Sequence, residues 1–310
     1  MADILVAAEL RELLPDDPLP GHTVQWLAGD DPTPAGRYEA IVPLLSRRVG
    51  EAELDALPQL RIVANCAVGY DNIDLAAAGR RGVLVTNTPD VLTEATADLT
   101  WALILAVARR LKEGEQMIAE ARWPGWHPTQ LLGLELHGST LGIVGAGRIG
   151  QAVGRRAVGF GMRILYGDRE RRPDFERVTG AAYADLPQLL GESHVVTVHV
   201  PSTGETRGMF DRTAFAAMRP GALFVNTARG DLVDEDALVA ALAGHLGGAG
   251  LDVFAHEPAV PEALATHPRV VTLPHLGSAT TETRRAMAGL AVENVRVVLA
   301  GGPPLTPVAR

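Results

Sequence analysis

Cysteine and lysine are almost absent from this 310-residue chain, which has one of each. A single cysteine, Cys66, cannot form an internal disulfide and fits a reducing cytoplasm. We expect it to be a small buried residue and not a nucleophile, because it lies in an apolar stretch. The only lysine, Lys112, lies beside Glu113 and Glu115 on an expected amphipathic helix. The chain therefore lacks a Walker lysine and a suitable lysine for pyridoxal phosphate chemistry.

Other familiar signatures are missing too. There is no GxSxG, no HExxH and no cluster of cysteine with histidine, which disfavours hydrolase and zinc sites. The net charge is -9, the pI is about 5.5 and the basic residues form no dense block, so nucleic acid and anionic membranes are poor partners. The longest strongly apolar helical run, residues 101–108, is too short to cross a bilayer. With no basic segment before the first apolar strand, we expect no export signal and a cytoplasmic protein.

The most informative stretch, residues 139–168, reads as strand, glycine loop, helix, second strand and carboxylate. Gly145 would allow a tight turn, Gly147 would let the backbone approach a pyrophosphate, and Gly150 would let the helix pack closely on the strand. The start of a helix also attracts phosphates. This order predicts a dinucleotide site. The residues of its loop are Gly145, Ala146, Gly147, Arg148, Ile149 and Gly150.

Asp168 follows the second strand of this stretch. A carboxylate at that place accepts hydrogen bonds from the adenosine ribose hydroxyls, which favours NAD over its 2'-phosphorylated form. Arg169, Arg171 and Arg172 come directly afterwards, however, and guanidinium groups suit a 2'-phosphate. We favour NAD because the carboxylate repels that phosphate, and NADP stays open as the alternative.

The alternation of strands and helices predicts two α/β domains, as expected for a chain too long for one core. The first hundred residues predict a small flavodoxin-like unit, with strands at 4–8, 23–27, 40–44, 61–67 and 83–86. One long helix is expected over residues 94–121. Strands then follow at 139–144, 162–166, 194–200, 222–227, 248–254 and 269–273, the pattern of a doubly wound parallel Rossmann sheet.

The terminal amphipathic helix, residues 281–300, is too short to be a domain, and we expect it to return to the N-terminal unit. The predicted division is therefore a substrate-binding domain of residues 1–97 plus 281–310 and a dinucleotide-binding domain of residues 98–280.

Three chemically active residues, Arg229, Glu257 and His275, follow directly on the later strands. Parallel strands bring their carboxyl ends to one edge of the sheet, where the glycine loop also opens, so the three side chains can converge there. Arg229 can hold a substrate carboxylate with two hydrogen bonds and polarise the neighbouring carbonyl. His275 can donate a proton to the carbonyl oxygen, and Glu257 can fix the tautomer of its ring. The set suits reduction of a 2-oxo acid beside a nicotinamide.

The motifs at residues 68–74, 86–89, 145–150, 199–206, 226–230, 250–258 and 274–280 together resemble the D-isomer-specific 2-hydroxyacid dehydrogenases. The resemblance extends from about residue 60 to the C-terminus. It is strongest to glyoxylate/hydroxypyruvate reductases, through residues 67–74, 89–93 and 126–128. It implies a catalytic set of Arg229, Glu257 and His275, with His275 as proton donor.

The resemblance also implies the binding residues and an assembly. The substrate would meet the backbone near Val68 and Gly69 together with Arg229 and His275. A homodimer would form through the helix at residues 101–108 and the segment of Trp126, which would reach the partner's active site. The implied cofactor contacts are the loop from Gly145 to Gly150 with Asp168, Arg169, Pro201, Thr206, Thr227, Ala228, Arg229, Asp252, His275 and Gly277.

Alternatives remain at this point. Asp231, Asp234, Glu235 and Asp236 resemble a metal site, but acids that cap and charge the first turn of a helix at residues 237–243 explain them better; we expect no metal. Other substrates, including D-lactate, stay open. A 3-phosphoglycerate dehydrogenase is less favoured, because we see no regulatory domain after the catalytic region and no basic cluster for a substrate phosphate. The remaining alternative is not an enzyme: a corepressor of the same fold, which senses the cofactor, would bind NAD without catalysing a reaction.

Overall fold

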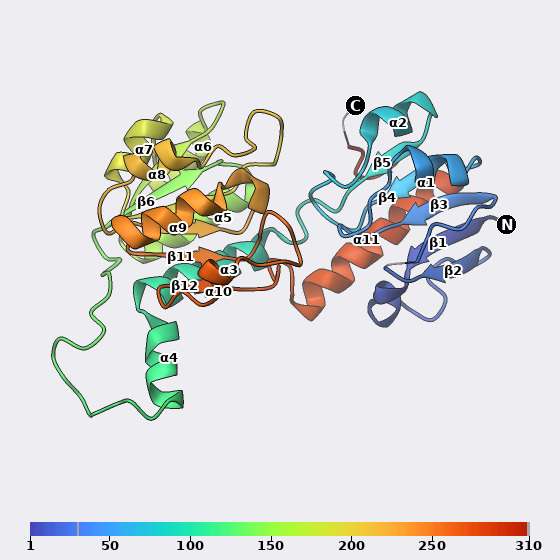
Figure 1. Ribbon diagram of the computed structural model, residues 1–310. Helices are drawn as coiled ribbons and strands as arrows, with labels where there is room; N and C mark the ends of the chain where they lie inside the picture. The colour runs from blue at the N-terminus through green and yellow to red at the C-terminus, as the bar shows by residue number, and fades with distance from the viewer. Residues whose placement is uncertain (30, 309–310) are drawn as a thin grey trace. The chain divides into compact units, whose positions relative to one another are not determined.

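Two compact units make up the computed structural model, which describes residues 1–29 and 31–308. Unit 1 combines Met1–Leu92 with the segment that begins at Ser278, and unit 2 is Thr93–Gly277. In Figure 1 the colours of both chain ends meet in unit 1. The boundaries expected after residues 97 and 280 lie close to these. The first is displaced because a helix that packs within unit 2 begins at Thr93.

Unit 1 is built on a parallel sheet of strand order β2-β1-β3-β4-β5. Its strands are β1 (Asp3–Ala7), β2 (Thr23–Leu27), β3 (Tyr38–Val42), β4 (Ile62–Ala64) and β5 (Leu84–Thr86), and its helices are η1 (Ala8–Leu13), α1 (Glu51–Ala56), α2 (Leu75–Arg80) and α11 (Thr281–Leu299). The long α11 packs against β3 and β4, so the terminal helix does return to the N-terminal unit (Figure 1). The strand order is the flavodoxin-like one, as predicted.

Unit 2 is built on a parallel sheet of strand order β12-β11-β10-β9-β6-β7-β8. Counted from β6, this is the Rossmann order 3-2-1-4-5-6 with one further strand. The strands are β6 (Thr140–Val144), β7 (Arg163–Gly167), β8 (Ala182–Tyr183), β9 (Val195–Val198), β10 (Leu223–Asn226), β11 (Gly248–Leu251) and β12 (Val270–Thr272). The helices are α3 (Thr93–Ala108), α4 (Leu111–Ala119), α5 (Arg148–Gly159), α6 (Pro173–Thr179), α7 (Leu186–Glu192), α8 (Arg212–Ala217), η2 (Gly230–Leu232), α9 (Glu235–Gly244) and α10 (Glu262–Ala265).

Two apolar layers cover the faces of this sheet. Helices α7, α8 and α9 share one core, which includes Phe215 and Leu238. Helices α3 and α5 share the other, which includes Trp101 and Val153. Burial on both faces explains why the strands of unit 2 are almost continuously apolar. It also leaves the strand ends as the place where polar side chains can gather.

The single helix expected over residues 94–121 is wrong, because α3 ends at Ala108 and α4 begins at Leu111. Arg110 between them has a φ of 53°, in the left-handed region. The returning chain enforces the break, since Leu134 donates its N–H to the Ala108 carbonyl at 2.9 Å. A Cβ on Gly133 would lie 2.0 Å from that same carbonyl oxygen, so only glycine allows the approach.

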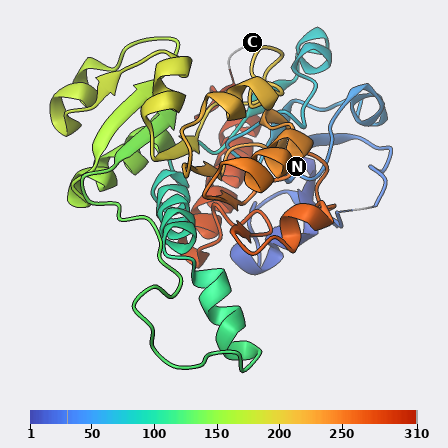
Figure 2. The same cartoon turned by 60° about the vertical axis from the view of Figure 1, so that its left-hand side comes forward.

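Helix α4 and residues 120–132 form an arm, which stands away from the sheet of unit 2 in both views (Figures 1 and 2). No residue of α4 is buried. Within the parts of the chain that the structure describes, no helix is both long and apolar enough to cross a membrane.

Candidate active site

The glycine loop lies between β6 and α5 with the geometry that a dinucleotide site needs. Gly145 has a φ of 97°, and a Cβ there would lie 2.8 Å from backbone atoms of His199 and Val200. A Cβ on Gly150 would lie 2.1 Å from the Gly145 carbonyl oxygen, so α5 and the loop approach each other closely. Gly147 caps α5, is exposed and has open space where a side chain would be. The first amides of α5 can therefore meet a pyrophosphate, and the loop fits the cofactor.

Asp168 lies directly after β7 and is held by its neighbours. Its Oδ1 accepts the N–H of Arg169 at 2.6 Å, and its Oδ2 accepts hydrogen bonds from Nε and Nη2 of Arg172 at 3.3 and 3.2 Å. Arg171 is paired with Glu176 at 2.8 Å. Two of the three arginines that could bind a 2'-phosphate, Arg171 and Arg172, are thus already paired with carboxylates.

Arg229 is held at the end of β10 by its own segment. The buried side chain of Asn226 donates from Nδ2 to the Arg229 carbonyl at 2.8 Å and accepts the N–H of Ala228 at 3.0 Å. The next residue has no room for a side chain, because a Cβ on Gly230 would lie 1.8 Å from the carbonyl carbon of Phe254. The segment of Arg229 therefore packs directly against the segment that leads to Glu257.

Glu257 and His275 form a hydrogen-bonded pair, with 2.8 Å between Oε2 and Nδ1. The other carboxylate oxygen, Oε1, accepts the N–H of Phe254 at 3.0 Å. This leaves Nε2 of His275 without a hydrogen bond to any residue that the structure describes. A partly exposed imidazole held at Nδ1 by a carboxylate can present Nε2 to a substrate oxygen.

Glu257 stays charged around neutrality because of its surroundings. Burial raises the pKa of Glu257, but the hydrogen bonds from His275 and Phe254 and the charges of His275 and Arg229 outweigh this, and its pKa falls below the ordinary value. The Arg229 charge thus acts on Glu257 directly. The structure brings the three residues of the predicted catalytic set together.

Asp252 holds the backbone on which His275 lies. Its carbonyl accepts the His275 N–H at 2.9 Å, and its two carboxylate oxygens accept the N–H groups of Leu276 and Gly277 at 2.7 and 2.8 Å. These contacts stabilise the φ of 55° at His275, which few non-glycine residues adopt. Burial raises the pKa of Asp252 to about 6, although the two amides and the His275 charge lower it. The carboxyl therefore takes up a proton as the pH falls through that value.

The other implied cofactor residues of unit 2 lie at the same edge of its sheet. The hydroxyl of Thr227 lies 2.9 Å from that of Thr100 on α3, behind the Arg229 segment. Gly277 donates to Asp252, and its carbonyl accepts from Thr96 Oγ1 at 3.1 Å. Pro201 accepts a hydrogen bond from Thr206 Oγ1 at 2.6 Å, which closes a tight loop after β9.

Val68 and Gly69 lie in unit 1, at the carboxyl end of its sheet, shortly after β4. The Val68 carbonyl accepts from Asn87 Nδ2 and the Gly69 carbonyl from Asn65 Nδ2, both at 2.8 Å. These side-chain amides fix the backbone of the loop that the resemblance assigned to the substrate carboxylate. The sequence alone assigns neither asparagine a role: Asn65 lies inside the strand expected at 61–67, and Asn87 belongs to the motif at 86–89.

The predicted role of the acids at residues 231–236, capping and charging the start of a helix, is confirmed only in part. Asp234 caps α9 by accepting the N–H of Ala237 at 3.0 Å, as predicted. Glu235 and Asp236 lie in the first turn of α9, also as predicted, and the Glu235 carboxylate in addition accepts the N–H of Ala255 at 3.0 Å, next to the Glu257 segment. For Asp231 the interpretation is wrong, because it lies before α9 and its carboxylate bonds to the loop after β9. No cluster suited to a metal occurs among the described residues.

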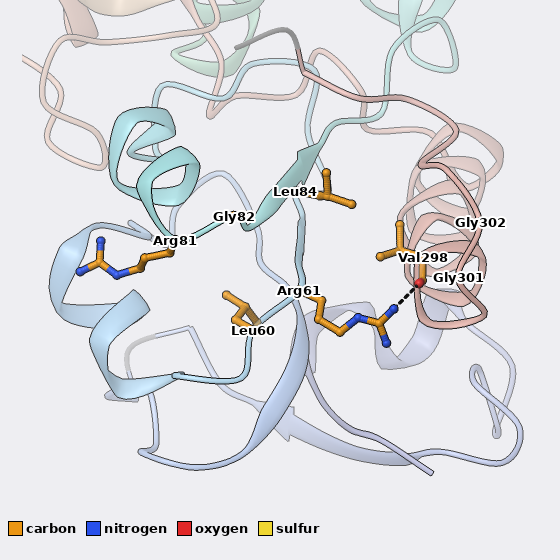
Figure 3. A pocket seen from close by; sticks show the side chains of 8 residues that line it. All are labelled: Leu60, Arg61, Arg81, Gly82, Leu84, Val298, Gly301 and Gly302. Atoms are coloured by element: carbon orange, nitrogen blue, oxygen red, sulfur yellow. Dashed lines mark hydrogen bonds between the residues drawn. The ribbon is translucent and has the colours of Figure 1, made fainter.

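Cys66 is buried, and burial raises the pKa of its thiol to about 12, so it is no nucleophile, as expected. A surface hollow of about 390 Å³ in unit 1 is lined by none of the candidate site residues (Figure 3). It is at the amino ends of β4 and β5, and its arginines are engaged: Arg61 with Glu39 and the Val298 carbonyl, Arg81 with Asp55.

Residues 101–277 match the family model for the D-isomer specific 2-hydroxyacid dehydrogenase NAD-binding domain. A glyoxylate reductase of Thermococcus onnurineus is 50% identical over 277 residues, which is 88% of this chain and 83% of that relative. This chain belongs to the D-isomer-specific 2-hydroxyacid dehydrogenase family. The membership predicted from the motifs is confirmed, and the chain is an NAD(P)-dependent oxidoreductase with a Rossmann domain.

Solved structures match nearly the whole chain. The TT0316 protein of Thermus thermophilus has a TM-score of 0.89 at 43% identity and covers 99% of this chain and 100% of its own. An NADPH-dependent glyoxylate/hydroxypyruvate reductase of Sinorhizobium meliloti, in complex with citrate, has a TM-score of 0.88 at 38% identity, with coverage of 100% and 98%. The family fold therefore accounts for both units.

Proposed function

We propose that this dehydrogenase reduces small 2-oxo acids, with glyoxylate and hydroxypyruvate as its main substrates. The observation that carries the proposal is the His275–Glu257 pair at 2.8 Å, whose carboxylate also feels the Arg229 charge, at the sheet edge where the glycine loop opens. The relatives named glyoxylate reductase and glyoxylate/hydroxypyruvate reductase support the choice of substrate.

Each residue has a separate task in this mechanism. The nicotinamide, when bound, supplies the hydride. Arg229 binds the substrate carboxylate through paired hydrogen bonds and places the carbonyl. His275 donates the proton on Nε2 to the carbonyl oxygen as that oxygen gains negative charge. Glu257 keeps the proton on Nδ1 in place and stabilises the charged ring before transfer.

The proposal predicts oxidation of NADH over a panel of oxo acids, with glyoxylate and hydroxypyruvate giving the highest kcat/KM. Pyruvate and 3-phosphohydroxypyruvate in the same panel test the lactate and phosphoglycerate alternatives, and absorbance at the nicotinamide band follows each rate. Tight NADH binding without turnover of any oxo acid would contradict the proposal and favour a cofactor-sensing binding protein.

We propose NAD as the preferred cofactor, on the Asp168 carboxylate at the end of β7. Asp168→Ala is expected to raise the KM for NADH about tenfold or more, since hydrogen bonds to a charged group contribute about 1.5–3 kcal/mol each. The same change removes the charge that repels a 2'-phosphate and releases Arg172, so kcat/KM with NADPH should rise. Steady-state kinetics with both cofactors measures the ratio.

Asp174→Ala is the control for this variant, because Asp174 is 95% exposed on the nearby α6 and, among the residues that the structure describes, pairs only with Arg177. It should leave the cofactor ratio unchanged. A wild-type protein that prefers NADPH, or an unchanged ratio in Asp168→Ala, would contradict the assignment.

We also propose a homodimer, formed through the arm. The helix at residues 101–108, which the resemblance also implied, has fewer side chains to offer, because Trp101, Leu103, Ile104, Val107 and Ala108 are buried within unit 2. The arm instead exposes large apolar side chains, and Trp126 is 81% exposed. Such a concentration of exposed apolar surface favours burial against a second copy.

Ile118→Arg should therefore produce a monomer, seen as a halved mass by size-exclusion chromatography with light scattering. Val178→Arg on α6 is the matched control, since Val178 and Ile118 are both 61% exposed and only Ile118 lies on the arm. A monomeric wild type, or equal masses for the wild type and Ile118→Arg, would refute this interface.

We propose that the protein works in the cytoplasm, because its one buried cysteine requires no oxidising compartment. Recovery of the protein from a compartment other than the cytoplasm in cell fractionation would contradict this.

A further inference from the structure

Asp231 connects two segments of unit 2 that leave different strands. Its Oδ2 accepts hydrogen bonds from Ser202 Oγ at 2.7 Å and from Arg207 Nε at 3.1 Å. Its backbone carbonyl accepts the N–H of Gly208 at 2.8 Å. Within the described chain, Asp231 receives every hydrogen bond that residues 202–208 donate outside their own loop, apart from the bond of Thr206 Oγ1 to the carbonyl of the adjoining Pro201. One residue therefore holds both ends of this loop.

The loop at residues 202–208 adjoins the glycine loop. It continues from His199 and Val200, whose backbone atoms leave no room for a Cβ on Gly145. Its own shape comes from local turns, in which Thr206 Oγ1 accepts the N–H of Thr203 at 2.9 Å. Local turns fix the shape of a loop but not its place on the sheet edge. That place depends on the bonds to Asp231.

On its other side, Asp231 is joined to Arg229 through one glycine. Asn226 and the close contact of Gly230 with Phe254 leave the backbone of this segment little freedom. A shift of Asp231 is therefore transmitted to Arg229, and the reverse also holds. The segment that carries the substrate arginine and the loop beside the dinucleotide form one connected unit.

The second carboxylate oxygen gives an independent indication of the role of Asp231. Oδ1 is buried and accepts no hydrogen bond from any residue of the described chain. A buried oxygen without a hydrogen bond lowers the stability of the fold, and such oxygens are rare in folded proteins. The carboxylate at this position is thus poorly explained by stability.

We propose that Asp231 is a positioning residue that couples dinucleotide binding to the placement of Arg229 on the substrate carboxylate. Bound cofactor fixes the position of residues 202–208. Because Ser202 and Arg207 bond to Asp231, the fixed loop also fixes the backbone segment that carries Arg229. The inference rests on the proposed function, because it assumes that Arg229 meets a carboxylate and that the loop meets the cofactor.

The test compares the affinity for oxamate, an unreactive analogue of a 2-oxo acid, with and without saturating NADH by titration calorimetry. In the wild type, NADH should tighten oxamate binding. Asp231→Asn keeps the size of the side chain but loses the charge, so the enhancement should fall about tenfold. The Tm should stay within about 2 °C, because the ion pair that is lost is with the largely exposed Arg207 and contributes little to stability. Asp236→Asn is the matched control: Asp236 is exposed in the first turn of α9, and the variant makes the same change of charge.

Ser202→Ala removes the same hydrogen bond but leaves Asp231 in place. Together with the double variant it completes a double-mutant cycle. If the Ser202–Asp231 bond transmits the coupling, the double variant loses little more of the enhancement than either single variant.

The inference would be overturned if NADH enhanced oxamate binding in Asp231→Asn and Ser202→Ala as much as in Asp236→Asn, while the wild type still reduces oxo acids. A wild type that binds neither cofactor nor oxamate would instead overturn the proposed function. A large loss of Tm in Asp231→Asn with coupling intact in Ser202→Ala would assign Asp231 a structural role only and overturn the inference.

Discussion

His275→Ala is expected to lower kcat by about 10²- to 10⁴-fold, the usual contribution of a positioned general acid. The reason is geometric: His275 has Nδ1 bound to Glu257 at 2.8 Å, so only Nε2 is available to the substrate oxygen. The Kd for NADH should change much less than kcat, because most of the implied cofactor contacts, including the glycine loop, lie on other elements. Single-turnover rates of NADH oxidation, together with the Kd for NADH, separate the two effects.

His256→Ala is the control for this prediction, since His256 is an exposed imidazole close in sequence and none of its side-chain atoms has a hydrogen bond within the described chain. It should keep the rate of the wild type. Glu257→Gln retains an oxygen that can face Nδ1 but removes the charge, so its loss of kcat should be smaller than that of His275→Ala. A His275→Ala variant with the rate of the wild type would remove the proposed proton donor.

The convergence of the three residues could be predicted because each comes shortly after a strand of unit 2. Arg229, Glu257 and His275 are far apart in sequence, yet parallel strands bring their carboxyl ends to one edge, so the order of strands was sufficient to unite them. The glycine loop was predictable for a similar reason, since glycine is required where a Cβ would collide with backbone.

The features that escaped prediction depend on contacts distant in sequence. The helical pattern continues through Arg110, and only the returning chain at Gly133 ends α3. Likewise, the carboxylates of Glu235 and Asp252 resemble ordinary helix or strand-end acids until the backbone amides of Ala255, Leu276 and Gly277 are placed beside them. The sequence thus predicts which side chains perform the chemistry better than which ones hold the backbone beneath them.

Arg229→Ala is expected to lower kcat/KM for hydroxypyruvate by about 10²- to 10⁴-fold. Two hydrogen bonds to a carboxylate contribute about 3–6 kcal/mol together, and they also place the carbonyl for hydride transfer. Arg229→Lys keeps the charge but not the paired geometry, so it should recover only part of the loss. Steady-state kinetics should show a raised KM together with a lowered kcat in both variants.

A substrate without the carboxylate separates substrate recognition from general damage to the site. The wild type should greatly prefer hydroxypyruvate to dihydroxyacetone, which has a hydroxymethyl group in place of the carboxylate, and Arg229→Ala should lose most of this preference because no guanidinium remains to recognise the acid. Arg212→Ala, an exposed arginine at the start of α8, should retain the preference of the wild type. If the preference survives in Arg229→Ala, another group binds the carboxylate, and Arg229 serves only to lower the pKa of Glu257 through its charge.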